Sequence, residues 1–152
     1  LLACAVAAEE VVLTSWGGDA PVYHKFVEMN DPVMGGKSIG TWNDANDQTP
    51  KYGTMDGVVN DVPSLAAPGF IKAAADGTFA DASAMIDGDL VLTVRSSTPE
   101  YKGFRVTFAA GTMSPSYSCA GGGGIPFSRG CFKAKFEVPA GKEFVKVRIP
   151  FN

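Results

Sequence analysis

The sequence has one histidine, a small net charge and no long apolar run, and each shortage argues against a class of function. His24 has no cysteine or aspartate at metal-ligand spacing, and no G-x-S-x-G motif is present. A formal net charge of −3 gives no general attraction to nucleic acid or to acidic membranes. No apolar run approaches the roughly 20 residues of a membrane-spanning helix. We therefore expect no enzyme activity, no cofactor or metal, no nucleic-acid binding and no transmembrane segment.

Cysteine is also scarce, with three residues in the chain. Cys4 lies in an apolar N-terminal stretch, which leaves Cys119 and Cys131 as an even pair. The glycine-rich segment between them lets its ends meet, and a bridge there would stabilise the fold by about 3 kcal/mol. In an oxidising compartment we predict a disulfide. The alternative is two free thiols that pack as small apolar side chains.

The N-terminal stretch has the composition of a leader. Residues 1–8 are small and apolar, and two glutamates follow at once. Ala5-Val6-Ala7 has the form of a signal-peptidase site, so we interpret residues 1–8 as the end of a cleaved leader. The alternative is that these residues form a first buried strand. The length predicts a single domain over residues 9–152, and we expect it to be truncated at its C-terminus.

Glycine and proline are plentiful, at eighteen and ten residues, and no amphipathic helix of ten or more residues is evident. Four segments in the second half alternate apolar and polar side chains: 90–95, 104–108, 132–138 and 145–151. Shorter strand-like segments precede them at 11–14, 37–42, 52–62 and 70–73. A period of two is typical of half-buried strands. The sequence therefore predicts an all-β protein, mainly antiparallel, built as a sandwich or barrel.

The stretch from Asn30 to Gly40 combines several devices that shape the backbone. Asn30 and Asp31 can accept hydrogen bonds from nearby backbone N–H groups and so start a turn. A proline follows, and the diglycine at 35–36 permits backbone geometry or close approach that other residues resist. Met34 is the apolar side chain between these devices. The stretch therefore predicts a tight turn around a buried Met34.

This stretch also resembles the N-terminal signature of the complex I intermediate-associated protein 30 family. The matching residues are Asn30, Asp31, Met34, Gly35, Gly36 and Ser38. Segments 69–72, 89–95, 101–104 and 147–151 resemble later parts of the family pattern, so the resemblance covers about residues 16–152. It implies a galactose-binding-like β-sandwich of jelly-roll type. It also implies a non-catalytic role, chaperone-like, in assembly of the NADH:ubiquinone oxidoreductase of respiration.

The predicted site is the signature together with one arginine: Asn30, Asp31, Met34, Gly35, Gly36, Ser38 and Arg95. Two interpretations stay open for its polar side chains. In the first they satisfy backbone groups of the turn, and in the second they form a binding surface. Arg95 either pairs with Asp31 or presents its planar donors to a partner. The polar loop at 43–48 offers oxygen ligands but lacks the glycine and glutamate of a helical calcium loop, which favours a solvated turn.

Two functions follow from this reasoning. The first is a module that binds protein partners, namely assembly intermediates of an electron-transfer complex, in a mitochondrion or plastid. The alternative is a secreted β-sandwich that binds carbohydrate. The leader-like start favours entry through the secretory pathway, since a mitochondrial transit peptide would be rich in arginine and serine. A plastid reached through the endoplasmic reticulum would reconcile the two.

Overall fold

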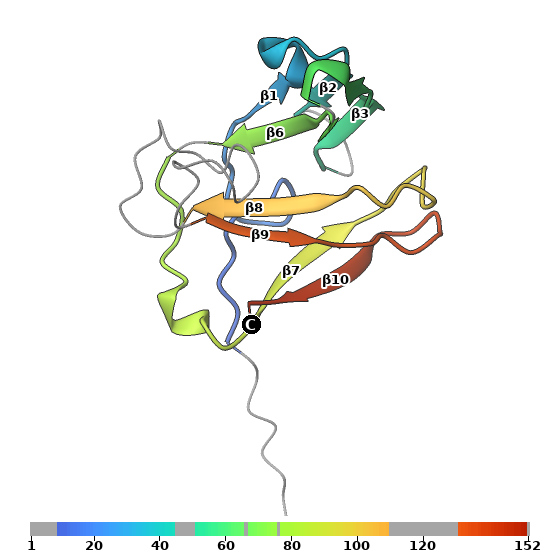
Figure 1. The fold of residues 1–152 in the computed structure, drawn as a ribbon. Coiled ribbons are helices and arrows are strands. Elements are labelled where there is room, and N and C mark those ends of the chain that lie inside the picture. The colour runs from blue at the N-terminus through green and yellow to red at the C-terminus, as the bar shows by residue number, and fades with distance from the viewer. Residues whose placement is uncertain (1–8, 45–50, 66, 76, 110–130, 152) are drawn as a thin grey trace, which may run out of the picture. The chain divides into compact units, whose positions relative to one another are not determined.

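The computed structural model describes residues 9–44, 51–65, 67–75, 77–109 and 131–151 (Figure 1). The chain divides into two compact units, Leu1–Asp81 and Ala82–Asn152, and each is described by itself. In the described ranges strands dominate, every paired ladder is antiparallel, and helix is limited to short 3₁₀ turns. The protein is therefore all-β, as the period-two segments predict.

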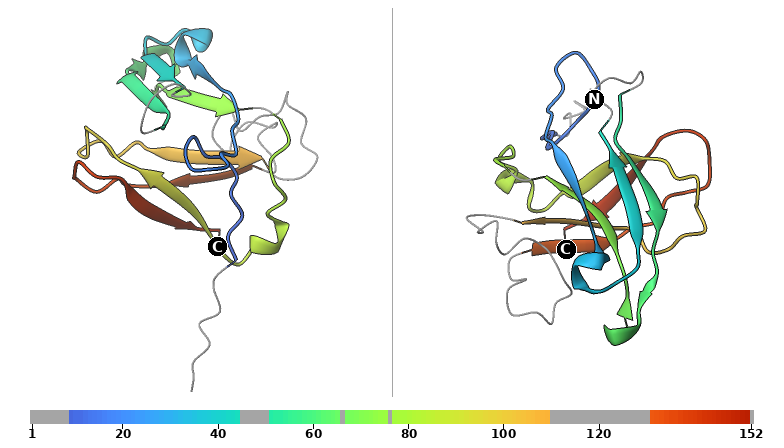
Figure 2. Two further views of the ribbon diagram at one scale, coloured as in Figure 1. Left: turned by 180° about the vertical axis from the view of Figure 1, so that it is seen from behind. Right: turned by 90° about the horizontal axis from the view of Figure 1, so that it is seen from above.

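In the part of the first unit that the structure describes, the strands form three two-stranded antiparallel ladders. They pair β1 (Phe26–Asn30) with β6 (Ile71–Ala75), β2 (Ile39–Asn43) with β3 (Thr54–Val58), and β4 (Asp61–Val62) with β5 (Ala67–Pro68). A 3₁₀ turn η1 (Asp31–Met34) follows β1, and η2 (Pro63–Leu65) joins β4 to β5. The longer strands can be followed in two further views (Figure 2). This connectivity places the end of β1 next to the start of β6, because Asn30 is the register partner of Ile71.

An aromatic cluster packs the interior of the first unit. The rings of Trp16, Phe26 and Trp42 are in mutual contact, with centroids 5.4–5.9 Å apart. Gly53 leaves room for the Trp42 ring, since a Cβ there would lie 2.2 Å from Trp42 Cη2. Gly40 packs in the same way against Ile71, where a Cβ would lie 2.8 Å from the Ile71 side chain. The Gly40 and Trp42 face of β2 is therefore the packed face, and the two ladders meet across it.

The described residues of the second unit form two antiparallel ribbons. They pair β7 (Asp89–Val94) with β10 (Val145–Pro150) and β8 (Arg105–Ala109) with β9 (Cys131–Lys135), after a 3₁₀ turn η3 (Ser83–Met85). Phe108 and Phe132 on the second ribbon both contact Phe151 directly after β10, with centroids 5.8 and 5.2 Å away. Ile149 and Val138 are 5% exposed. These contacts join the ribbons through an apolar interface, while the charged residues of β8, β9 and β10 face outward.

One predicted strand is absent from the structure. Residues 11–14 are β-branched and apolar, yet they form no ladder. The chain turns back directly afterwards, where the Ser15 N–H donates to the Val22 carbonyl at 2.6 Å. A strand needs a pairing partner as well as propensity, and the described chain offers residues 11–14 none. The segments at 37–42, 52–62, 70–73, 90–95, 104–108, 132–138 and 145–151 do contain strands.

Some predictions fall outside the described residues. These are the leader at residues 1–8, most of the polar loop at 43–48, Cys119, and the side chain of Cys131. Within the ranges that the structure does describe, no helix is long and apolar enough to cross a membrane.

Candidate functional site

The signature stretch forms a closed turn at the end of β1. Asn30 is extended, with φ −121° and ψ 164°, and η1 begins at the next residue with Pro32 in its first turn. Gly35 ends the helix with φ 80°, a left-handed conformation that glycine adopts without a steric cost. The N–H groups of Gly35 and Gly36 then donate back to the carbonyls of Pro32 and Asp31, both at 3.1 Å. The diglycine is therefore a helix C-cap that returns the chain toward β2.

The Asp31 carboxylate is the centre of this turn, and its side chain is 1% exposed. Oδ1 accepts the Ser38 N–H at 2.8 Å. Oδ2 accepts the Phe70 N–H at 3.0 Å and a short hydrogen bond from the Ser38 hydroxyl. The Asp31 N–H donates in turn to the Phe70 carbonyl at 3.1 Å. One carboxylate thus connects the turn to the residues before β2 and before β6.

Ser38 extends this network to a fourth segment of the chain. Its side chain is 0% exposed, and its hydroxyl accepts the Asn60 N–H at 2.9 Å while it donates to Asp31. The Asn60 side-chain amide donates to the Lys37 carbonyl at 2.9 Å, and the Asn60 carbonyl accepts the Gly69 N–H at 2.9 Å. We call Asp31, Ser38, Asn60, Gly69 and the Phe70 N–H the Asp31 cluster. Its polar groups satisfy one another, as buried polar groups generally do.

Two glycines are required by the space around the carboxylate. A Cβ on Gly36 would lie 2.2 Å from Asp31 Oδ1. A Cβ on Gly69 would lie 1.8 Å from Asp31 Oδ2, 2.3 Å from the Asn60 carbonyl oxygen and 2.6 Å from the Ser38 hydroxyl. Separations under 3.0 Å are not seen for real Cβ atoms. The backbone at both positions must therefore approach the carboxylate more closely than any residue with a side chain allows.

The same network decides the protonation state of Asp31. Burial of the carboxylate acts to raise its pKa. Hydrogen bonds from the Ser38 hydroxyl, the Ser38 N–H and the Phe70 N–H act in the opposite direction, and together they hold the pKa of Asp31 below its ordinary value of 3.8. Asp31 is therefore ionised at neutral pH, and its negative charge is balanced by donors rather than by a cation.

This geometry defines what the Asp31 cluster can do chemically. Both oxygens of the carboxylate are occupied by donors from the chain, and neither Asp31 nor Ser38 reaches the surface. The arrangement holds four chain segments at fixed distances, which is the first of the two interpretations made from the sequence. The second interpretation, a surface of polar atoms open to a partner, does not fit Asp31 and Ser38 because they are buried.

The other signature residues have different surroundings. Asn30 donates its side-chain amide to the Gly40 carbonyl at 2.9 Å and so ties β1 to β2. Lys37 is exposed beside the cluster. The side chain of Met34 lies outside the described part, so its burial stays a prediction.

Arg95 belongs to the second unit and not to the unit that holds the cluster. It donates to the Lys142 carbonyl at 3.3 Å, and its guanidinium lies 4.9 Å from the centroid of the Phe144 ring. The described donors to Asp31 all come from the first unit. The pairing of Arg95 with Asp31 therefore stays a prediction.

The remaining candidates are structural in their described surroundings. His24 stacks on Phe79 with centroids 3.8 Å apart. Asp44, at the start of the polar loop, accepts hydrogen bonds from Trp16 Nε1 at 2.7 Å and from the Tyr23 hydroxyl at 2.5 Å. Among the residues whose placement the structure gives, no group of three His, Cys, Asp or Glu side chains has metal-binding geometry.

Sequence reasoning missed Asn60 entirely. Gly69 and Phe70 resemble the start of a strand in the family pattern, and that resemblance gives no link to Asp31. Ser38 and Asn60 are 22 residues apart, and Asp31 and Phe70 are 39 apart. No local pattern connects residues at such separations. The one available signal was the co-occurrence of both segments in a single family pattern.

Comparison with known proteins finds no matching family model, no matching curated protein and no matching solved structure.

Proposed function

We propose that this protein is a non-catalytic protein-binding module similar to the assembly factors of respiratory complex I, with a galactose-binding-like β-sandwich fold of jelly-roll type. The observation that carries the proposal is the convergence on Asp31. Asp31, Gly36, Ser38, Gly69 and Phe70 all belong to segments that resemble the family pattern, and they meet around one buried carboxylate. A pattern whose separate parts build one structural feature is better explained by a shared fold than by coincidence.

The character of the cluster supports binding over catalysis. Catalytic groups must reach a substrate, whereas the carboxylate of Asp31 is already occupied and enclosed. A satisfied buried network makes a rigid scaffold, and rigid scaffolds that carry exposed loops and faces are common in recognition. The role we assign to Asp31 and Ser38 is therefore to position the surface, not to contact the partner.

The surface of the first unit carries apolar side chains suited to a protein partner. Ile39 and Val58 lie directly opposite each other on β2 and β3, and they are 71% and 62% exposed. On β1, Val27 and Met29 are 60% and 46% exposed. Exposed apolar side chains that lie next to each other, as Ile39 and Val58 do, are a feature of surfaces that bind proteins. This arrangement supports a protein partner over a soluble sugar.

The test is a pull-down with the tagged protein from detergent-solubilised membranes of mitochondria and plastids. We expect to recover subunits of assembly intermediates of an NADH:ubiquinone oxidoreductase complex, and an Ile39→Asp variant should recover at least several-fold less. Thr41→Asp, on the same exposed face of β2, is the matched control for an added carboxylate.

A glycan array with the same protein separates the two candidate functions. We expect no binding to any sugar. A saturable glycan signal combined with no recovered protein would favour the carbohydrate-binding alternative. Localisation of a tagged full-length protein to a secretory compartment alone would also contradict the organellar assignment.

A further inference from the structure

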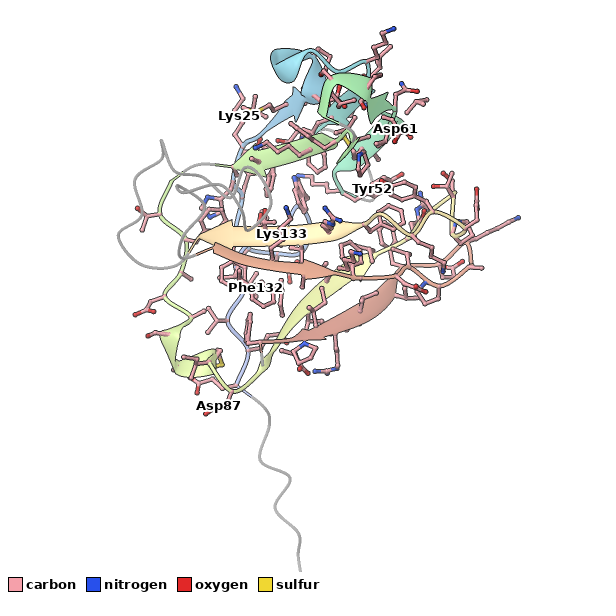
Figure 3. The ribbon with its side chains drawn as sticks, viewed as in Figure 1. Lys25, Tyr52, Asp61, Asp87, Phe132 and Lys133 are labelled. Atoms are coloured by element: carbon pink, nitrogen blue, oxygen red, sulfur yellow. The ribbon has the colours of Figure 1, made fainter. Side chains whose placement is uncertain are left out.

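The ribbon of β8 and β9 carries three cations on one face. Its register places Arg105 opposite Lys135 and Thr107 opposite Lys133, and all four side chains are exposed. We call these four residues the cationic face. The opposite face is apolar and half-buried, and Phe132 and Lys133 are labelled on opposite sides of the ribbon (Figure 3).

Among the described residues of this unit, no carboxylate forms an ion pair with Arg105 or Lys135, which lie opposite each other at one end of the ladder. The ion pairs between described residues of this unit join Lys102 to Glu137 at 2.8 Å and Arg148 to Asp89 at 3.4 Å. Within the described chain, Arg105 is in neither pair, nor is Lys135. Like charges directly opposite each other on an antiparallel ladder destabilise it. The free protein therefore has a local electrostatic cost that an external anion would remove.

The charge of the chain is also divided unevenly along its length. Residues 82–152 contain nine Lys and Arg against five Asp and Glu, whereas residues 1–81 contain four against eleven. The net charge of −3 hides this division. The cationic face is thus part of a basic half of the chain rather than an isolated pair of lysines.

We propose that the cationic face binds an acidic segment of a protein partner. The inference rests on the proposed function and names the chemistry of the partner. Nucleic acid is disfavoured because the described side chains of this face include no aromatic ring on which a base could stack. A membrane surface is disfavoured because they include no apolar side chain that could insert into lipid. Carboxylates spaced along an extended segment match cations that lie about 5–7 Å apart on a ladder.

The key variant is Lys135→Glu, because the proposal predicts opposite effects on stability and on binding. The new carboxylate faces Arg105 across the ladder, so repulsion becomes attraction and the melting temperature should rise by about 1–4 °C. Binding to an immobilised poly-glutamate peptide should weaken about tenfold or more. Lys146→Glu is the matched control, since Lys146 is exposed on β10 opposite Thr93 and the change in net charge is the same. It should leave poly-glutamate binding within about twofold of the parent.

Three further arms separate the alternative ligands. The parent protein is also measured against single-stranded DNA, against vesicles that contain phosphatidylserine, and by sedimentation at several protein concentrations. Stronger binding to DNA or vesicles than to poly-glutamate would overturn the proposal, as would self-association that only Lys135→Glu abolishes. Equal losses of poly-glutamate binding in Lys135→Glu and Lys146→Glu would also overturn the proposal, because net charge alone would then explain the binding.

The pull-down distinguishes failure of this inference from failure of the proposed function. If the parent and Lys135→Glu recover the same assembly intermediates equally well, the proposed function stands and the cationic face is rejected. If the parent recovers none, the proposed function fails, and a tenfold loss of poly-glutamate binding in Lys135→Glu still supports the cationic face.

Discussion

Replacement of Gly69 by alanine tests the Asp31 cluster most directly. The added methyl would lie 1.8 Å from Asp31 Oδ2 and 2.3 Å from the Asn60 carbonyl oxygen. Gly69 does not have a left-handed φ, so the substitution tests space and not backbone strain. Neither Asp31 Oδ2 nor the Asn60 carbonyl oxygen is the flexible end of a long side chain. The backbone before β6 or the backbone at Asn60 must therefore move.

The expected cost comes from two terms. Overpacking of a filled site costs about 1–3 kcal/mol. Displacement of Asn60 or Ser38 leaves a buried polar group without its partner, which costs a further 1–3 kcal/mol or so. We therefore expect Gly69→Ala to lower the free energy of unfolding by about 2–6 kcal/mol, a large share of the roughly 5–15 kcal/mol of a typical domain.

Urea denaturation followed by tryptophan fluorescence is a suitable assay, because Trp16 and Trp42 both belong to the unit that contains Gly69. Gly17→Ala is the matched control. Its Cβ would lie 3.6 Å from the nearest atom, the Lys51 carbonyl oxygen, which is ordinary contact. The control should stay within about 0.5 kcal/mol of the parent or gain slightly.

A double-mutant cycle then locates the cause. In an Asp31→Ala background the contact with Asp31 Oδ2 is gone. Gly69→Ala should therefore lower the free energy of unfolding by less than it does in the parent. A loss below about 0.5 kcal/mol for Gly69→Ala in the parent would refute the geometry of the cluster. Strictly additive losses in the cycle would refute the contact between the two residues.

Three other predictions concern the same chain. Ser38→Ala should lower the free energy of unfolding, measured by urea denaturation, by about 1–3 kcal/mol, because Asp31 and the Asn60 N–H both lose a hydrogen-bond partner. The control Thr41→Ala, on the exposed face of β2, should stay within about 0.5 kcal/mol of the parent. The lowered pKa of Asp31 means that its carboxylate stabilises the fold above pH about 4 and that this contribution is lost as pH falls through the folded-state pKa. The stability difference between the parent and Asp31→Asn should therefore shrink on acidification, and a difference that stays constant between neutral pH and pH about 3 would contradict the assignment. Mass spectrometry of alkylated, non-reduced protein from an oxidising compartment should find a disulfide between Cys119 and Cys131. Full labelling of both thiols would reject the disulfide.

Much of the secondary structure could be predicted from the sequence because its causes are local. Alternation with a period of two identifies β7, β8, β9 and β10, since successive side chains on a strand point to opposite faces. The turn after β1 could be predicted for the same kind of reason. Proline fixes φ in its first turn, and Gly35 supplies the left-handed cap. Such constraints act within a few residues and do not depend on the rest of the fold.

Pairing is where prediction from residue type failed. Residues 11–14 have the composition of a strand and form none, because a ladder depends on a neighbour and not on propensity. The orientation of β2 is a second case. Gly40 and Trp42 face the packed side of β2, whereas Ile39 faces outward and is 71% exposed. Residue type alone would have placed Ile39, and not its neighbour Gly40, on the packed side. Space next to Ile71 decides this, since only glycine fits there.

The sequence by itself determined that the chain is all-β and that residues 30–36, which include the acidic residue Asp31, form a tight turn. Only the tertiary structure decided what that acid does. Asp31 is enclosed by donors from Ser38 and Phe70, seven and 39 residues away, and Asn60 closes the network through Ser38. Sequence distance carries no information about which backbone N–H groups will meet a carboxylate. The register of β1 with β6, set by packing of the whole unit, brings them together.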